Sequence, residues 1–195
     1  MRYILASGSP RRKELLSRVL PEFEIMPATF DEESLQEEPL EIVKDLAYQK
    51  ASEIFYKTLT DTGERLVVIG ADTVVSYNQR VLGKPSDRHE AEEMLRMLQG
   101  RTHCVYTGVS VMYNQDKETG VFTFGECTEV MVAPMSDEEI AAYAATGESD
   151  DKAGAYGIQG DFSKFVVGIK GDYSNVVGLP VASLYKRLKQ HGLLC

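Results

Sequence analysis

Residues 66–77 read Leu-Val-Val-Ile-Gly-Ala-Asp-Thr-Val-Val-Ser-Tyr, and the architecture expected of the whole chain follows from this run. The run is rich in β-branched residues and almost continuously apolar, which is typical of a strand that is covered on both faces. It predicts the central strand of a sheet. A single acid, Asp72, interrupts it.

The position of Asp72 inside an apolar strand needs a physical explanation. A carboxylate is costly to bury unless it meets a cation, a metal ion or a group of hydrogen-bond donors, or opens into a cleft at the end of the strand. Asp72 is therefore either a structural residue that accepts hydrogen bonds from backbone amides, or a metal ligand or general base. Both roles stay open from the residues alone.

Strands and helices alternate on both sides of this run. Apolar segments predict strands over residues 2–6, 23–27, 102–113, 121–134 and 165–169, with residues 114–120 as the connection of a hairpin. Amphipathic or capped segments predict helices over about residues 10–20, 40–59, 86–99, 136–145 and 180–191. We therefore predict one domain, residues 1–195, of the α/β class with a mixed sheet.

The composition limits the kinds of partner. With 195 residues and a formal net charge of −9, the chain has length for a core but lacks the basic surface that binding to a nucleic-acid backbone needs. Its three cysteines and three histidines show no C-x-x-C pair and no metal-ligand spacing, which argues against a disulfide scaffold and a structural zinc site. No apolar run approaches membrane-spanning length, and the N-terminal one is too short for a signal peptide. We expect a cytoplasmic protein that binds neither nucleic acid nor membrane.

A candidate phosphate site follows the first predicted strand, where residues 7–13 read Ser-Gly-Ser-Pro-Arg-Arg-Lys. Ser9 is a natural helix N-cap and Pro10 fits the first helical position. Arg11 and Arg12 then add positive charge to a helix end that is already positive, which costs roughly 0.3–1 kcal/mol each unless an anion binds there. Ser9 and both arginines are therefore candidates for binding phosphate, and the alternative is a solvated basic turn.

An acidic run follows in residues 29–41, which contain no lysine or arginine. Most of its acids are expected in a solvated loop and in the first turn of a helix. One of Glu32 and Glu33 could supply an oxygen ligand to a hard cation such as Mg²⁺.

Lysines and glycines complete the set of candidates. Lys50, Lys84 and Lys152 are each, taken alone, expected on the surface. Residues 152–160 read Lys-Ala-Gly-Ala-Tyr-Gly-Ile-Gln-Gly, and glycines at this spacing indicate backbone that passes close to a ligand. The pattern is neither G-x-G-x-x-G nor a Walker loop. Residues 171–175 are interpreted as a structural turn.

Taken together, these segments closely resemble the Maf family of nucleoside triphosphate pyrophosphatases. The resemblance rests on residues 7–16, 70–75, 83–85, 101–103 with 107–109, 151–160 and 171–180, in the family's order. It implies an elongated α/β fold of the inosine-triphosphate-pyrophosphatase type, with two lobes around a central cleft. It also implies cleavage of the α–β anhydride to a monophosphate and pyrophosphate, with Mg²⁺ or Mn²⁺, in a nucleotide house-cleaning role.

The resemblance assigns roles residue by residue. Asp72 matches the proposed proton acceptor and, together with Glu32, the acidic metal positions, although Glu33 is only one register away. Positions associated with base choice are matched by Arg11, Thr73 and Gln159. Polar cleft residues expected near phosphate are matched by Arg12, Lys50 and Lys84. Members of the family often form homodimers, so a homodimer is one assembly that the resemblance implies.

The form of residues 152–160 looks like the branch of the family that acts on dTTP and UTP, including modified uridine triphosphates. A glutamine amide both donates and accepts hydrogen bonds, which suits the O4 and N3–H edge of uracil or thymine. Three alternatives remain: the family's 7-methyl-GTP branch, a non-catalytic nucleotide-binding regulator of septum formation, and a sugar-nucleotide or phosphomonoester enzyme.

Overall fold

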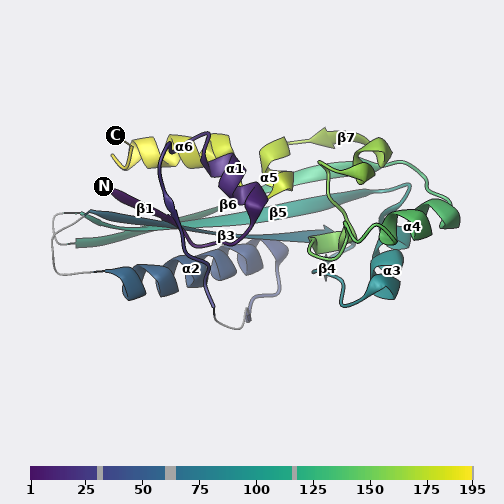
Figure 1. Cartoon of the computed structure of the whole chain (residues 1–195), viewed down its shortest axis with the longest axis horizontal. Helices are drawn as coiled ribbons and strands as arrows, with labels where there is room; N and C mark the ends of the chain where they lie inside the picture. The colour runs from purple at the N-terminus through teal and green to yellow at the C-terminus, as the bar shows by residue number, and fades with distance from the viewer. Residues whose placement is uncertain (30–32, 60–64, 116–117, 195) are drawn as a thin grey trace. The chain divides into compact units, whose positions relative to one another are not determined.

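The computed structural model describes residues 1–29, 33–59, 65–115 and 118–194, in which strands and helices alternate (Figure 1). The strands are β1 (Arg2–Leu5), β2 (Glu24–Ile25), β3 (Leu66–Tyr77), β4 (Arg80–Leu82), β5 (Thr102–Gln115), β6 (Glu118–Val132) and β7 (Val166–Lys170). The helices are α1 (Pro10–Leu16), α2 (Pro39–Thr58), α3 (Arg88–Leu98), α4 (Asp137–Ala144), α5 (Tyr173–Val177) and α6 (Val181–Gln190). Two short 3₁₀ helices are η1 (Ala153–Ala155) and η2 (Asp161–Phe165).

The strands form one mixed sheet. Its order is β2-β1-β3-β5-β6-β7, and β4 pairs with β3 outside that path. Strand β1 runs parallel to β2 and β3, whereas the β3–β4 and β6–β7 pairs are antiparallel. The predicted α/β class with a mixed sheet is therefore confirmed, as is the position of residues 66–77 inside the sheet.

The chain divides into two compact units. The first comprises Met1–Asp72, Thr107–Glu126 and Gly178–Cys195, and the second comprises Thr73–Tyr106 and Cys127–Val177. The expectation of a single domain with one central cleft stays a prediction. None of the described helices is both long and apolar enough to span a membrane.

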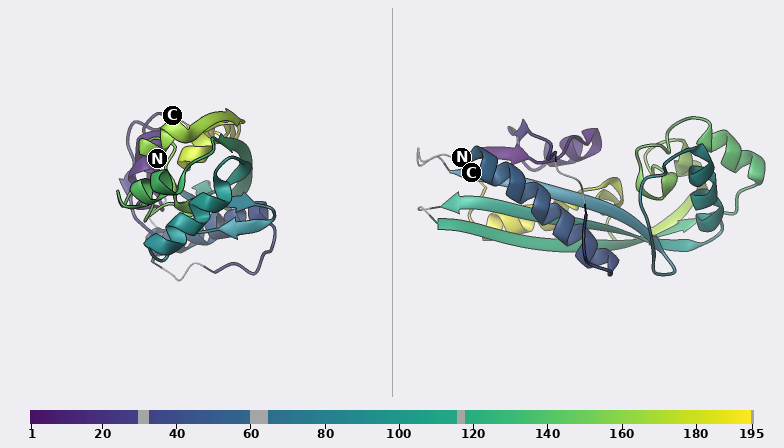
Figure 2. Two further views of the ribbon diagram at one scale, coloured as in Figure 1. Left: turned by 90° about the vertical axis from the view of Figure 1, so that its right-hand side faces the viewer. Right: turned by 90° about the horizontal axis from the view of Figure 1, so that it is seen from below.

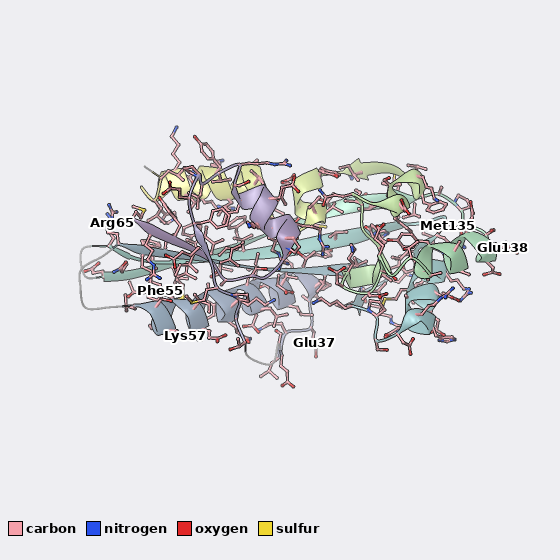
Figure 3. The ribbon with its side chains drawn as sticks, in the orientation of Figure 1. Glu37, Phe55, Lys57, Arg65, Met135 and Glu138 are labelled. Atoms are coloured by element: carbon pink, nitrogen blue, oxygen red, sulfur yellow. The ribbon has the colours of Figure 1, made fainter. Side chains whose placement is uncertain are left out.

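In the first unit, α2 covers one face of the strands, and α1 and α6 lie on the other (Figure 1). Helix α2 runs obliquely across these strands (Figure 2) and buries Phe55, which is labelled in Figure 3, in a cluster with Ile4, Val68 and Met112. Glycines allow the close approach. A Cβ atom on Gly70 would lie 2.3 Å from the carbonyl oxygen of Ala47.

In the second unit, α3 contacts both α4 and η1. Its core includes aromatic rings in tilted and edge-to-face pairs, with the Phe162 ring centroid 5.2 Å from that of Tyr143, 4.6 Å from that of Tyr156 and 5.7 Å from that of Phe165. Burial of such large rings supplies much of the driving force for folding this part of the chain.

Several predicted boundaries are wrong. The strands of the predicted hairpin continue to Gln115 and resume at Glu118, so the connection is shorter than residues 114–120. Helix α1 ends at Leu16 rather than near residue 20. Strand β4 was not predicted. Residues 171–175 have the expected structural role at the start of the short helix α5: buried Asn175 donates to the carbonyl oxygen of Val105 and to Oγ1 of Thr128.

Candidate functional site

A buried ion pair joins α2 to β3 within the first unit. Nζ of Lys50 lies 2.7 Å from Oδ1 of Asp72 and donates a hydrogen bond to it. The Lys50 side chain is 9% exposed and the Asp72 side chain 11%. The expectation of a surface position is therefore wrong for Lys50. The cation that a carboxylate in an apolar strand requires is present.

The sequence brings these two residues together through the face of β3. Gly70 and Asp72 are two residues apart in the strand, so both face the same side, where α2 packs. Gly70 lies against the backbone of Ala47 and Ala51, and Lys50 belongs to the same stretch of helix. Because Gly70 has no side chain, the helix rests close enough for Lys50 to reach Asp72.

The turn before α1 contains a second polar group of the first unit. Ser9 is the predicted N-cap, with Oγ accepting a hydrogen bond from the backbone N–H of Arg12 at 3.4 Å, and Pro10 begins the helix. The Arg12 guanidinium donates from Nε to the carbonyl oxygen of Gly178 at 2.9 Å and from Nη1 to Oγ of Ser7 at 3.2 Å. Arg11 lies half-buried beside it on α1. The structure thus fixes the Arg12 side chain through Ser7, which the sequence analysis did not single out.

The other expected site residues belong to the second unit. Thr73 is half-buried in β3, Lys84 is exposed in the turn after β4, and Gln159 is exposed between η1 and η2. The turn of Lys84 and the glycine-rich segment are side by side, because the N–H of Gly154 donates to the carbonyl oxygen of Gly83 at 3.0 Å. Lys84 and the start of the segment that carries Gln159 are therefore brought together.

The glycines of this segment have partners inside the protein. Gly154 has a φ of +70° and packs against Val75, where a Cβ atom would lie 2.8 Å from Cγ2. A Cβ atom on Gly160 would lie 2.2 Å from Oε1 of Glu148. The spacing that indicated a close ligand is thus also required by contacts within the second unit.

The acidic positions are only partly described. Glu32, the predicted second metal ligand, lies outside the described residues. Glu33 is exposed, and its carbonyl oxygen accepts a hydrogen bond from the side chain of Gln49. Among residues 1–29, 33–59, 65–115 and 118–194, no group of three or more histidine, cysteine, aspartate or glutamate side chains could hold a metal ion. Asp72 is the described carboxylate of the candidate site.

A buried histidine in the second unit was also missed by sequence reasoning. His103 is 2% exposed, and its Nε2 lies 2.7 Å from the hydroxyl oxygen of Tyr156 in the glycine-rich segment. Its Nδ1 has no hydrogen-bond partner in the described part of the chain. Burial lowers the pKa of His103 to about 4, so the ring is neutral at physiological pH. The sequence pattern of a strand does not show whether a histidine in it makes a buried hydrogen bond, as His103 does with Tyr156, or only packs in the core.

Comparison with known proteins agrees with the resemblance noted from the sequence. The family described as Maf-like protein matches residues 2–191. Proteins called dTTP/UTP pyrophosphatase are similar to the chain in Agathobacter rectalis (47% identity, 97% of each chain), Bacillus cytotoxicus (50%, 97% of this chain and 95% of the relative) and Bacillus mycoides (51%, 96% and 94%). Among solved structures, the Ham1 protein of Staphylococcus aureus matches with 12% identity and a TM-score of 0.41, over 98% of this chain and 100% of that one. A match to the family over nearly the whole sequence, with relatives near 50% identity, leads to one conclusion: the chain belongs to the Maf family.

Proposed function

We propose that this protein is a nucleoside triphosphate pyrophosphatase that hydrolyses dTTP and UTP to the monophosphate and pyrophosphate. Relatives of that name, about 50% identical over nearly the full length, support the substrate class. The observation in the structure that carries the proposal is the buried pair of Lys50 and Asp72. A buried carboxylate that accepts a hydrogen bond from a lysine side chain is a suitable group for proton abstraction beside a polyphosphate.

The proposed step is the attack of water on the α-phosphorus. Asp72 accepts the proton of the water molecule as its oxygen bonds to phosphorus. The bond from the α-phosphorus to the bridging oxygen breaks, and its electron pair leaves with pyrophosphate. Lys50 fixes the orientation of the Asp72 carboxylate through the hydrogen bond to Oδ1, which directs Oδ2 to the water.

The cationic candidates are proposed to bind the triphosphate. Arg12 has a fixed guanidinium because Ser7 and Gly178 hold it, and Arg11 and Lys84 add positive charge. Guanidinium groups are suited to phosphate oxygens because they donate several hydrogen bonds in one plane. Gln159 and Thr73 are proposed to read the base, with Arg11 assisting and Ser9 contributing a hydroxyl near phosphate.

A divalent cation, Mg²⁺ or Mn²⁺, fits the donor chemistry. Magnesium is commonly held by one or two carboxylates together with substrate phosphates, and Asp72 supplies one such carboxylate in the described structure. Glu32 is proposed as the second. When bound, the ion would offset phosphate charge and favour deprotonation of water. We also propose that the protein acts in the cytoplasm, the compartment expected from the sequence.

The test is a substrate screen with product identification. Purified protein is incubated with dTTP, UTP, ATP, GTP and 7-methyl-GTP in the presence of Mg²⁺ or Mn²⁺, and monophosphate, pyrophosphate and inorganic phosphate are measured together. We expect equal amounts of monophosphate and pyrophosphate, with dTTP and UTP at least about 100-fold faster than the purine nucleotides. Three outcomes would reject the proposal. Release of inorganic phosphate would favour a phosphomonoester enzyme, and faster cleavage of 7-methyl-GTP would favour the 7-methyl-GTP branch. Nucleotide binding without turnover would favour a non-catalytic regulator.

A variant of Gln159 tests whether this residue causes the expected preference for dTTP and UTP over purine nucleotides. Replacing Gln159 with alanine removes the amide that both donates to and accepts from the base edge. We expect Gln159→Ala to narrow the ratio of kcat/KM between dTTP and ATP, mainly by slowing dTTP. The matched control is Gln99→Ala. Gln99 is the residue that ends α3 and lies outside the candidate site, so the ratio should stay as in the unchanged protein.

A further inference from the structure

The segment that carries Gln159 is wrapped around one carboxylate. Oε1 of Glu148 accepts a hydrogen bond from the hydroxyl of Tyr143 at 3.0 Å, and Oε2 accepts one from the backbone N–H of Asp161 at 2.9 Å. The Tyr143 oxygen in turn accepts the backbone N–H of Gly157 at 3.2 Å. The two ends of the segment 157–161 are therefore bound to the same tyrosine–glutamate pair.

Close packing shows how tightly the segment encloses the carboxylate. A Cβ atom on Gly160 would lie 2.2 Å from Oε1 and 2.3 Å from Cδ of Glu148, and one on Gly157 would lie 3.1 Å from Oε1. The same Cβ atom on Gly157 would lie 2.7 Å from Cε of Lys152. A side chain at Gly160 would therefore displace the Glu148 carboxylate, and a side chain at Gly157 would displace the Lys152 side chain first.

The tyrosine is built into the core of the second unit. Tyr143 is 3% exposed, and its ring contacts Phe162. Burial raises the pKa of Tyr143 above its usual range, so the hydroxyl stays protonated and donates to Glu148. Glu148 is half-buried, and its own carbonyl oxygen accepts a hydrogen bond from Nζ of Lys152 at 2.5 Å. Contacts within the second unit therefore hold the Tyr143–Glu148 pair in place.

Gln159 is exposed in the middle of this segment, and Asp161 is exposed at its end. Ile158 before Gln159 is buried, while Gly157 and Gly160 are held as described. A side-chain amide selects between bases only if its position is fixed, because a mobile amide can adapt to a wrong hydrogen-bond pattern. The backbone contacts fix the point from which the Gln159 side chain extends, and this side chain makes no hydrogen bond to another residue that the structure describes.

We propose that Tyr143 and Glu148 are positioning residues for base selection, which act by holding the backbone of residues 157–161 and so the Gln159 amide. The proposal rests on the proposed function of Gln159 for its effect on specificity. The fixation of residues 157–161 by Tyr143 and Glu148 does not depend on the proposed function.

The structural part is tested by amide hydrogen exchange in Tyr143→Phe and Glu148→Gln. Tyr143→Phe keeps the ring but removes the acceptor of the Gly157 N–H, and Glu148→Gln places an amide group where a carboxylate accepts two hydrogen bonds. We expect the Gly157 amide in Tyr143→Phe and the Asp161 amide in Glu148→Gln to exchange at least about tenfold faster, the equivalent of one hydrogen bond of about 1.4 kcal/mol each. Glu138→Gln is the matched control, since Glu138 is an exposed acid on α4. Unchanged exchange at both amides would overturn the proposal.

The effect on specificity is tested by the ratio of kcat/KM for dTTP to that for ATP. We expect the ratio to fall about tenfold in Tyr143→Phe and Glu148→Gln, and to fall no further when either change is added to Gln159→Ala. Equal losses with both nucleotides, or additive losses in the double variants, would mean a general structural role and reject the proposal. Absence of dTTP and UTP hydrolysis by the unchanged protein would instead overturn the proposed function, and the exchange experiment would still decide whether Glu148 holds the segment.

Discussion

Nζ of Lys50 and Oδ1 of Asp72 are 2.7 Å apart, in a contact that connects the middle of α2 to the middle of β3. Both side chains are about nine-tenths buried. Removal of one partner from such a pair leaves a buried charge without compensation, which is far more costly than the pair itself is stabilising. The contact therefore has separate consequences for activity and for stability.

The activity consequence concerns the carboxylate. Asp72→Asn keeps the shape of the side chain but removes the base, and we expect turnover of dTTP to fall at least ~100-fold, the usual scale for a general base. The rate is measured at a temperature where circular dichroism shows the variant folded. Asp137→Asn, an exposed acid paired with Arg96, is the control and should retain the normal rate. Near-normal turnover of folded Asp72→Asn would reject the proposed proton acceptor.

The stability consequence concerns the ion pair as a whole. We expect Asp72→Leu and Lys50→Met each to lower the free energy of unfolding by about 3–5 kcal/mol, because each removes one member of a buried ion pair. The double variant replaces both charges by apolar groups and should recover most of this loss. Denaturant unfolding of the unchanged protein, the two single variants and the double variant gives a double-mutant cycle. A double variant that is as unstable as the sum of the two single ones would contradict the buried-pair interpretation.

The fixed guanidinium of Arg12 leads to a prediction that differs from the one based on helix charge alone. Repulsion at the start of α1 predicts that removal of the arginine stabilises the protein. Its hydrogen bonds to Gly178 and Ser7 predict the opposite, and they involve a charged donor, worth roughly 1.5–3 kcal/mol. We expect Arg12→Ala to lower the Tm without nucleotide and to reduce kcat/KM roughly 10- to 150-fold. A raised Tm in Arg12→Ala would show that the repulsion dominates.

Buried His103 predicts a pH dependence. Its pKa is lowered to about 4 in the folded protein, against an ordinary value near 6.5 after unfolding. The unfolded chain therefore binds more protons between these values, and the contribution of His103 is complete above pH 6.5 and is lost as the pH falls toward 4. We expect the stability difference between the protein and His103→Gln to change by roughly 3 kcal/mol between pH 7 and pH 4. His89→Gln, which alters an exposed histidine, is the control.

Gly70 and Gly108 predict a steric effect on α2. A Cβ atom on Gly108 would lie 2.2 Å from the carbonyl oxygen of Val43, as close as the one on Gly70 would be to Ala47. We expect alanine at either position to destabilise the protein by at least about 1–3 kcal/mol. Gly70→Ala should also slow turnover more than Gly108→Ala, since it displaces the helix beside Lys50. Gly83→Ala, where a Cβ atom meets nothing within 4 Å, is the control and should be nearly neutral.

The sequence predicted the elements whose signals are local. Residues 66–77 form a strand with the predicted ends because the run is almost continuously apolar and rich in β-branched residues, and Ser9 caps α1 as predicted. Strand β4 was missed because the turn before it uses Asn78 and Gln79 with φ of 49° and 64°. A tight hairpin of this kind is normally signalled by glycine at the second position, and glutamine conceals it.

The candidate site was predictable in its residue types but not in its contacts. An acid inside an apolar strand requires a cation, yet the sequence did not show that Lys50, expected on the surface, is that cation. The pairing depends on how α2 lies on β3, which is set by backbone contact at Gly70 rather than by any pattern in the helix. Glu148 was missed for a related reason, since its role arises from hydrogen bonds to Tyr143 and to the N–H of Asp161.

The lack of a side chain at Gly70 has a consequence for the proposed reaction. Where a helix rests on side chains, rotamer changes can let it shift by small amounts, but α2 rests at this point on the backbone of the strand. The distance from Lys50 to Asp72 is then set before any substrate arrives. In such a site the polar groups need little rearrangement when charge develops in the transition state, because they are already oriented toward that charge. In the proposed reaction, a glycine that takes no part in the chemistry would therefore lower the barrier, by keeping the carboxylate and its cation in fixed positions.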